Sequence, residues 1–510
     1  MDKTMICDAY KTMLREREWL PAALLLALGF ALRLAYLGAL PYGLNQDEAS
    51  AGYEAFALLH SGIDRCGDSW PVLFTAWGSG QNVLMSYLAL PFVALLGLSA
   101  LSVRLVNAIS GCLTLLVFWR LARRARGRAF GITALALLAV NPWHIMMSRW
   151  ALESNLLPLF LLLGVWLTAI AREKPWALAG AAASLALSLY AYGAAFFFLP
   201  LYLIAAAVWL RRYLRPGPLL VSLALGLLLA APIAACQLIN ALNLPPLRVL
   251  GFTLPRLTEG RQAAVSVLGG ADAEENFRGF LRILWTQSDG LPWNSLGVWR
   301  GGIFYFFGLP FAALGFFASL FRRRDYEAEG PLRIALVCAL LCAALIRCNI
   351  NRINMIWLPL IYFSALGLHL VCARLGNWAA APAAAAAVCL LLFVHAYRGV
   401  LGGGGNPAFF PGLGAAVEYA QALGHDGPVY ITDRVNQPYI FALFYTRTPP
   451  EDFAATVEYR DESAAFRAVK RFAGFEFEDR TRASVRILWK GEAEEEMILE
   501  RFGDFAVCTG

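Results

Sequence analysis

The chain has 510 residues, of which 59% are hydrophobic and 15% are charged, and its mean hydropathy is +0.56. Soluble domains carry about 25% charged residues, so this composition excludes an ordinary soluble protein. The net charge of +7 comes from basic residues clustered between apolar runs, which membrane topology explains without a nucleic-acid partner. The ten cysteines include no CxxC pair, so neither a zinc site nor a disulfide framework is indicated.

Apolar runs that approach the roughly 20 residues needed to cross hydrocarbon as a helix recur along the chain. The first follows a basic segment, residues 1–19, which we expect in the cytoplasm. The positive-inside rule also places the later basic clusters there: Arg120–Arg128, Arg172–Lys174, Arg211–Arg215, Arg322–Arg333 and Arg374. The pattern predicts an α-helical polytopic membrane protein with about eleven transmembrane helices, near 20–39, 102–121, 129–147, 154–171, 176–192, 194–210, 218–237, 302–321, 332–347, 352–372 and 378–396.

One apolar segment, Asn82–Leu98, does not fit this count. If it crossed the membrane, the five-arginine cluster and every later basic cluster would face outward. We therefore expect an interfacial helix there, within a first outer loop at 40–101. A second outer loop covers 238–301, and residues 20–398 form the membrane domain.

After residue 398 the sequence changes character. The glycine run Gly402–Gly405 indicates a linker. Residues 427–433 read as a short buried strand, 437–445 as a helix and 485–489 as another strand. We expect a small α/β domain at 399–510, outside the membrane.

An acidic pair, Asp47-Glu48, follows the first span. Asn45 with Glu48 three residues later is a capping-box pattern that starts a helix. Asp47 then lies in the first turn, where the helix dipole favours the carboxylate, and this suits a general base. The helix reads as amphipathic, with Ser50 and Glu54 on a polar face, and would lie flat on the membrane surface. The alternative is that the two acids only cap the helix and interact with solvent.

Two further polar segments should emerge on the same outer side. Ser148–Glu153 holds Arg149 and Glu153, and Arg347–Arg352 includes Asn351 and Arg352. Arginine donates two parallel hydrogen bonds to phosphate, so these segments suggest a site for an anionic group. The alternative for each arginine is a side chain that reaches the lipid headgroups.

The chain resembles glycosyltransferase family 39, the polyprenyl-phosphate-sugar-dependent enzymes related to protein O-mannosyltransferases and lipid A aminoarabinose transferases. Residues 20–375 carry the resemblance, in the acidic pair and four further stretches: Gly97–Leu105 with Arg104, Asn141–Glu153, Asn351–Pro359, and Asp64–Pro71 with Ala76–Asn82. Two departures are that Gly80–Asn82 replaces a histidine-proline-proline run, and that Glu153 stands where aspartate is commoner.

The resemblance implies the C-type membrane glycosyltransferase fold, with interfacial helices in the first outer loop. It implies a polyprenyl-phosphate sugar donor and an acceptor that is a protein, a glycan or a lipid. The sugar is transferred with inversion on the outer face of the plasma membrane. Asp47 would be the base, Glu48 its orienting partner and Arg352 the phosphate contact. Glu153 and Arg149 would shape the acceptor or metal side; a divalent metal is an open alternative, and no other cofactor is expected.

Two other classes of protein fit the same size and the same outer arginines. One is a transporter or flippase of lipid-linked sugars, although such proteins more often show internal repeats and helices broken near the midplane. The other is a non-catalytic scaffold for assembly of cell-envelope glycans.

Overall fold

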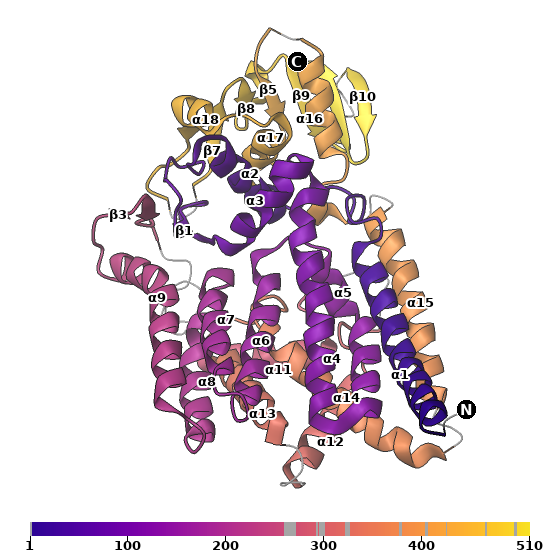
Figure 1. Cartoon of the computed structure of the whole chain (residues 1–510). Coiled ribbons are helices and arrows are strands. Elements are labelled where there is room, and N and C mark those ends of the chain that lie inside the picture. The colour runs from indigo at the N-terminus through magenta and orange to yellow at the C-terminus, as the bar shows by residue number, and fades with distance from the viewer. Residues whose placement is uncertain are drawn as a thin grey trace.

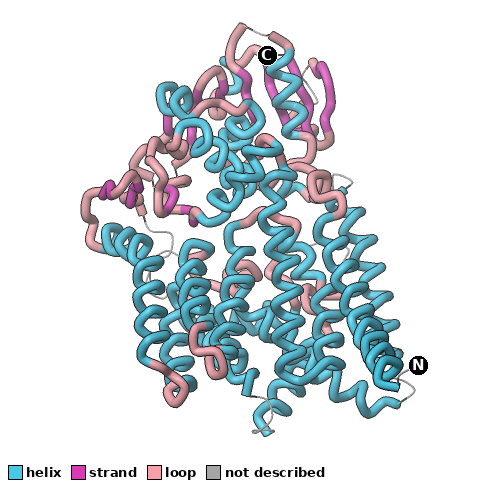
Figure 2. The backbone as a smooth tube through the Cα atoms, viewed as in Figure 1, coloured by secondary structure: helices cyan, strands magenta, loops and turns pink. Residues whose placement is uncertain are grey.

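The computed structural model describes residues 3–259, 272–291, 294, 301–321, 327–376, 380–402, 406–424, 426–464, 467–493 and 497–509. A bundle of long helices forms one end of the molecule, and a unit of strands and shorter helices forms the other (Figure 1). Two short helices lie between them. The tube view shows that the strands gather at the end away from the bundle (Figure 2).

The bundle contains a helix at each of the eleven predicted span positions. Their bounds are α1 Lys3–Leu34, α4 Ala100–Ala139, α5 Pro142–Ser148, α6 Leu157–Ile170, α7 Ala177–Ala191, α8 Ala195–Leu210, α9 Pro216–Ala241, α12 Gly308–Phe321, α13 Gly330–Leu345, α14 Trp357–Leu375 and α15 Ala380–Gly402. Among the described residues, five helices are long and apolar enough to cross a membrane by length and composition. The count of eleven crossings stays a prediction.

The basic cluster Arg120–Arg128 lies inside α4 and not in an open loop. The helix continues to a sharp break, where Arg126 and Gly127 leave helical geometry, Gly127 with φ +82°. Arg126 pairs there with Glu329, and Arg124 pairs with Glu173. The break lies at the end of the bundle away from the strands (Figure 1), so the predicted reversal of the chain direction occurs within one continuous helical segment.

Helices α2 (Gln46–Ser61) and α3 (Leu84–Leu96) form the middle layer, so the segment predicted to stay out of the bundle does so (Figure 1). The prediction that the polar face of α2 is exposed is wrong, because Ser50 and Glu54 are completely buried. Ser50 donates to Gln81 at 2.7 Å and accepts from Arg65 at 3.0 Å, and these partners from the same outer loop replace water. Short strands β1 (Leu73–Phe74) and β2 (Gln81–Asn82) pair between the two helices.

The second outer segment contains a hairpin, β3 (Leu247–Val249) with β4 (Phe252–Leu254), and one amphipathic helix, α11 (Ala273–Thr286). Backbone bonds join β4 to the first outer loop, from Val72 to Thr253 and from Thr253 to Ser69. Residues 260–271, 292–293 and 295–300 of this predicted loop lie outside the described residues, as do 322–326 of the predicted basic loop and 403–405 of the predicted glycine linker.

The last part of the chain forms a seven-stranded mixed sheet in the order β10-β11-β9-β5-β8-β7-β6. The strands are β5 Val429–Ile431, β6 Glu458–Tyr459, β7 Val469–Phe472, β8 Phe475–Glu476, β9 Val485–Trp489, β10 Ile498–Phe502 and β11 Phe505–Thr509, with helices α16 Leu413–Ala422, α17 Pro438–Thr446 and α18 Pro450–Thr456. The predicted strands at 427–433 and 485–489 correspond to β5 and β9, and the predicted helix corresponds to α17. Helix α17 packs on α2, and the Tyr53 hydroxyl donates to the Thr448 carbonyl at 2.8 Å.

Candidate functional site

Helix α2 begins with a complete capping box, as the sequence predicts. The Asn45 side chain accepts from the Asp47 amide at 3.1 Å, and Glu48 accepts from the Asn45 amide at 3.1 Å. Before the cap, Gly43 has φ +87°, and a Cβ there would lie 2.0 Å from the Phe409 carbonyl oxygen, so only glycine fits. Asp47 is thereby held in the first turn, where the partial positive charge of the helix end favours its ionised form.

Asp47 lines a polar cavity of about 260 Å³. Four of the predicted site residues meet there from three separate segments: Asp47 from α2, Glu153 from the turn before α6, and Asn351 with Arg352 from the loop before α14. The remaining lining residues are Asn45, Gln46, Trp150, Leu152, Ser154, Tyr192 and Asn349. The cavity therefore presents two carboxylates, several amides and one guanidinium to whatever enters it.

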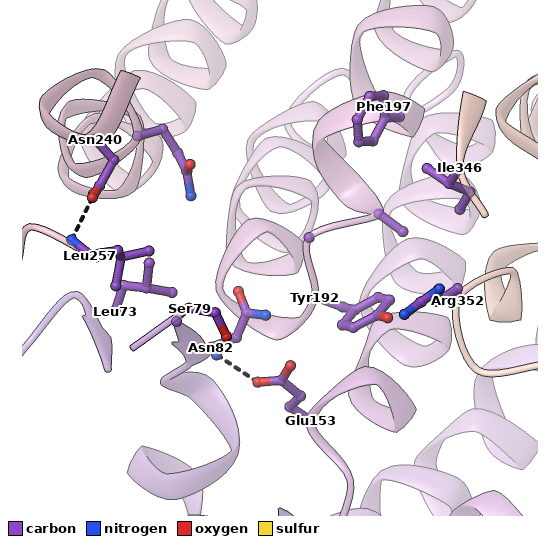
Figure 3. Close-up of a pocket in the computed structure, with 14 residues that line it drawn as sticks. Leu73, Ser79, Asn82, Glu153, Tyr192, Phe197, Asn240, Leu257, Ile346 and Arg352 are labelled. Atoms are coloured by element: carbon purple, nitrogen blue, oxygen red, sulfur yellow. Dashed lines mark hydrogen bonds between the residues drawn. The ribbon is translucent and has the colours of Figure 1, made fainter. Parts of the chain in front are cut away.

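A second, more apolar cavity of about 100 Å³ adjoins the first (Figure 3). Glu153, Tyr192 and Arg352 belong to the walls of both cavities. The apolar lining comes from both outer loops, from the start of α8 and from the end of α13: Leu73, Leu257, Ala194, Phe197 and Ile346. On the same wall, the Asn82 amide donates to Glu153 at 2.5 Å. The polar and apolar spaces therefore meet at a carboxylate, a tyrosine and an arginine.

Arg352 is half-buried at this junction, and Figure 3 shows its guanidinium directed toward the Tyr192 ring. Its backbone amide donates to Asn349 at 2.7 Å, which fixes the loop. Its guanidinium donates to the Arg347 carbonyl at 3.3 Å, a long contact, and forms no ion pair with any described residue. The Arg352 guanidinium can therefore bind an anionic group.

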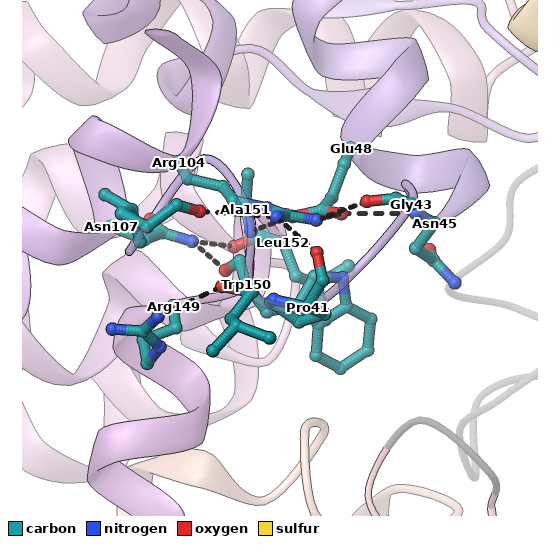
Figure 4. A network of polar contacts seen from close by, with 12 residues as sticks. Pro41, Gly43, Asn45, Glu48, Arg104, Asn107, Arg149, Trp150, Ala151 and Leu152 are labelled. Atoms are coloured by element: carbon teal, nitrogen blue, oxygen red, sulfur yellow. Dashed lines mark hydrogen bonds and ion pairs between the residues drawn. The ribbon is translucent and has the colours of Figure 1, made fainter. Parts of the chain in front are cut away.

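Glu48 lies in a buried network next to the cavity (Figure 4). Arg104 donates to both of its carboxylate oxygens, at 2.8 and 2.9 Å. The same guanidinium donates to the carbonyl oxygens of Pro41 and Gly43, each at 2.7 Å, and of Leu37 at 3.3 Å. Arg104 therefore holds the chain that enters α2 as well as the first turn of the helix.

The same network holds the segment that carries Glu153. Glu48 also accepts from the Ala151 amide at 2.9 Å. One turn along α4 from Arg104, the Asn107 side chain donates to the carbonyl oxygens of Trp150 and Leu152, at 2.7 and 2.9 Å. The positions of Asp47 and Glu153 are thus set by one set of contacts. Asn107 is not among the site residues predicted from the sequence, and Arg104 is predicted there only as part of a motif.

Arg149 lines neither of the two cavities. This buried arginine donates to the Tyr397 hydroxyl at 3.2 Å and to the carbonyl oxygens of Leu32 and Leu40 at 3.1 and 3.2 Å. It therefore joins the end of α5 to α1 and α15. Glu48 likewise does not line either cavity.

The polar cavity offers oxygen donors of the kind that hard divalent cations take. Besides the two carboxylates, the Asn351 Oδ1 atom is buried and has no hydrogen-bond partner among the described residues. Within the described ranges, no group of three or more His, Cys, Asp or Glu side chains could hold a metal ion. A divalent metal stays a prediction of the resemblance.

Comparisons with known proteins agree with this fold. A family model described as dolichyl-phosphate-mannose-protein mannosyltransferase matches residues 81–235. Two crystal structures of ArnT from Cupriavidus metallidurans, one apo and one bound to undecaprenyl phosphate, each align with a TM-score of 0.56 and 13% identity, over 96% of this chain and 97% of theirs. An oligosaccharyltransferase of Archaeoglobus fulgidus aligns more weakly, with a TM-score of 0.48 and 14% identity over 85% of this chain and 64% of the other. No curated protein matches the chain by sequence.

These matches define the class of protein. The predicted resemblance to glycosyltransferase family 39 is confirmed by the family model, and the fold is that of the C-type membrane glycosyltransferases. The chain is therefore a glycosyltransferase built around apolar helices.

Proposed function

We propose that the protein transfers a sugar from a polyprenyl-phosphate donor to an acceptor hydroxyl on the outer face of the plasma membrane, with inversion. The observation that carries this proposal is the junction of a polar and an apolar cavity at Glu153, Tyr192 and Arg352. Such a donor has a polar sugar phosphate and an apolar tail, so its two parts match the polar and the apolar cavity. The undecaprenyl phosphate in one of the ArnT structures supports the same ligand class.

The chemistry needs one base and one source of positive charge. The acceptor oxygen forms a bond to the anomeric carbon, its proton passes to Asp47, and the bond from that carbon to the phosphate oxygen breaks with its electron pair. Asp47 suits the first role because it lies at the cavity wall in the first turn of α2, where the helix dipole favours a carboxylate. Arg352 suits the second because charge grows on the departing phosphate oxygen beside it. A phosphate leaves without help from an acid, so one carboxylate suffices.

The other predicted residues take supporting roles in this proposal. Glu153 and Asn351 line the polar cavity and would orient the sugar or the acceptor. Glu48 would act through Arg104 and the backbone, by positioning Asp47. Arg149 would hold α5 in place and not contact substrate, because its donors are taken by Tyr397 and two carbonyl groups.

The orientation follows from the distribution of basic residues. Arg124 and Arg126 make their contacts near the break in α4, at the end of the bundle away from the strands, and Arg172 lies over the Trp209 ring near the end of α8. If this end faces the cytoplasm, the cavities and residues 399–510 lie on the outer side, with about eleven crossings between them. The basic N-terminal segment, residues 1–19, would then be cytoplasmic too.

A purified protein in proteoliposomes tests this function against the two alternatives. The donor is a radiolabelled polyprenyl-phosphate sugar, and a cell-envelope extract supplies acceptors. Transfer predicts labelled acceptor together with free polyprenyl phosphate in equal amounts. Intact donor that appears in the opposite leaflet would identify a transporter. Bound donor with neither change would identify a scaffold, and either of these results would overturn the proposal.

A further inference from the structure

The hairpin β3–β4 exposes an apolar surface. Leu247, Val249 and Phe252 are 48%, 46% and 49% exposed, and Leu250 at the turn is 93% exposed. Val249 pairs directly with Phe252, and Leu247 pairs with Leu254, so these side chains share one face of the hairpin. The exposed apolar residues therefore form one continuous surface that ends at the tip.

The tip residue is unusual for its turn. Leu250 has φ +51° and Gly251 has φ +85°, the pattern of a type I′ turn, in which asparagine or glycine is favoured at the first position. A leucine there is conformationally disfavoured. Its almost complete exposure shows that no contact within the described chain compensates for this cost. The Leu250 side chain is therefore available for contact with a partner outside the protein.

The neighbouring surface indicates what that partner is. Only a short loop, Leu242–Pro246, separates the hairpin from α9, and the most apolar part of α9 is only 17% buried. A helix of this composition that leaves its apolar side chains uncovered faces lipid. Three further exposed leucines, Leu238, Leu242 and Leu244, lie between the end of α9 and the hairpin along the chain. Arg248 and Arg256 are exposed on and beside the hairpin, where lipid phosphates would meet them.

The base of the hairpin is connected to the wall of the apolar cavity. Thr253 exchanges backbone hydrogen bonds with Ser69 and Val72 of the first outer loop. The Asn240 side chain at the end of α9 accepts from the Leu257 amide at 2.7 Å, as Figure 3 shows, and both residues line the cavity. A change in the position of the hairpin would therefore move one wall of that cavity.

We propose that the β3–β4 hairpin inserts its tip into the outer leaflet and holds the mouth of the apolar cavity against the bilayer. The partner is membrane lipid, bound through Leu250 and the apolar face of the hairpin. The link to the cavity rests on the proposed function, because it gives the lipid tail of the donor a direct path from the leaflet into the protein. The insertion itself does not depend on that function.

A fluorescent label on Leu250→Cys tests the insertion in proteoliposomes of phosphatidylcholine and phosphatidylglycerol. Nitroxide groups on the acyl chains just below the headgroups should quench this label strongly. The matched control is Glu500→Cys on the exposed strand β10, and protein without an added cysteine gives the background. Equal quenching at both positions would overturn the insertion, including the case in which a second copy or another protein covers the hairpin.

A second variant tests the connection to the cavity. Leu250→Asn keeps the turn and removes the apolar side chain, and Leu499→Asn makes the same change on the exposed strand β10. Binding of polyprenyl phosphate, measured as the thermal stabilisation it produces, should need a several-fold higher concentration in Leu250→Asn and be unchanged in Leu499→Asn. Equal binding in both variants would overturn the connection. Binding in the absence of any sugar transfer would instead contradict the proposed function and leave this inference standing.

Discussion

The buried ion pair between Glu48 and Arg104 should control both stability and turnover. Glu48 accepts from Arg104 twice and from the amides of Asn45 and Ala151. Both side chains are fully buried. Glu48→Gln leaves the guanidinium without a counter-charge, and breaking a buried pair in this way costs about 3–5 kcal/mol. The substituted amide also faces donors on two sides, so at least one buried donor loses its acceptor.

A double-mutant cycle measures the size of this effect. Arg104→Gln alone leaves Glu48 as the uncompensated charge, while the double variant contains no buried charge. We therefore expect the double variant to be less destabilised than the sum of the two single variants, by about 2 kcal/mol or more. The measurement is thermal unfolding in detergent, followed by the fraction that remains monodisperse. The control is Glu274→Gln, which breaks an exposed pair with Arg278 and should change nothing measurable.

The same variants separate stability from function. At equal amounts of folded protein, Glu48→Gln should still lower turnover, because Asp47 and Glu153 are both positioned through Glu48. Strict additivity in the cycle would refute the view that the two charges compensate one another. Normal turnover of folded Glu48→Gln would refute its positioning role.

Three further outcomes are expected. Arg352→Ala should raise the donor concentration required and lower turnover, with a combined effect of about 2–4 kcal/mol. Arg352→Lys should recover only part of this loss. If Arg352→Ala changed only the affinity for the acceptor, Arg352 would belong to the acceptor side of the site. Gly367→Ala should lower the melting temperature, because a Cβ would lie 2.0 Å from the Phe311 carbonyl oxygen, whereas Gly399→Ala has open space and should be neutral. Burial raises the pKa of Asp64 well above its ordinary value, so stability should be lost as the pH rises from that ordinary value through the raised one. Asp64→Asn should flatten this loss, and equal slopes in the two proteins would contradict it.

Local patterns were sufficient to predict several parts of this structure. The Asn45–Glu48 capping box involves residues three positions apart, so the start of α2 could be predicted from the sequence. Apolar runs mark the helices because hydrocarbon selects continuous apolar segments. The sidedness of the basic clusters predicted that Asn82–Leu98 does not cross the membrane, and α3 lies outside the bundle.

Contacts between distant segments could not be predicted in the same way. The sequence around Glu48 does not indicate that Arg104 is its partner. The polar face of α2 was predicted to be exposed because Arg65 and Gln81, which cover it, come from later in the chain. The sheet order is a similar case, since β5 lies between β8 and β9, both of which follow it at a distance. The junction of the two cavities requires three segments at once, those that carry Glu153, Tyr192 and Arg352.

In the proposed reaction, Asp47 takes the proton from the acceptor hydroxyl while the lipid phosphate departs. The most direct test compares release of polyprenyl phosphate by Asp47→Asn with release by wild type, at matched amounts of folded protein. Asp272→Asn is the control, because that aspartate is an exposed helix cap that asparagine replaces equally well. We expect a loss of about 10²-fold or more for Asp47→Asn and none for the control. Turnover near that of wild type in Asp47→Asn would contradict it.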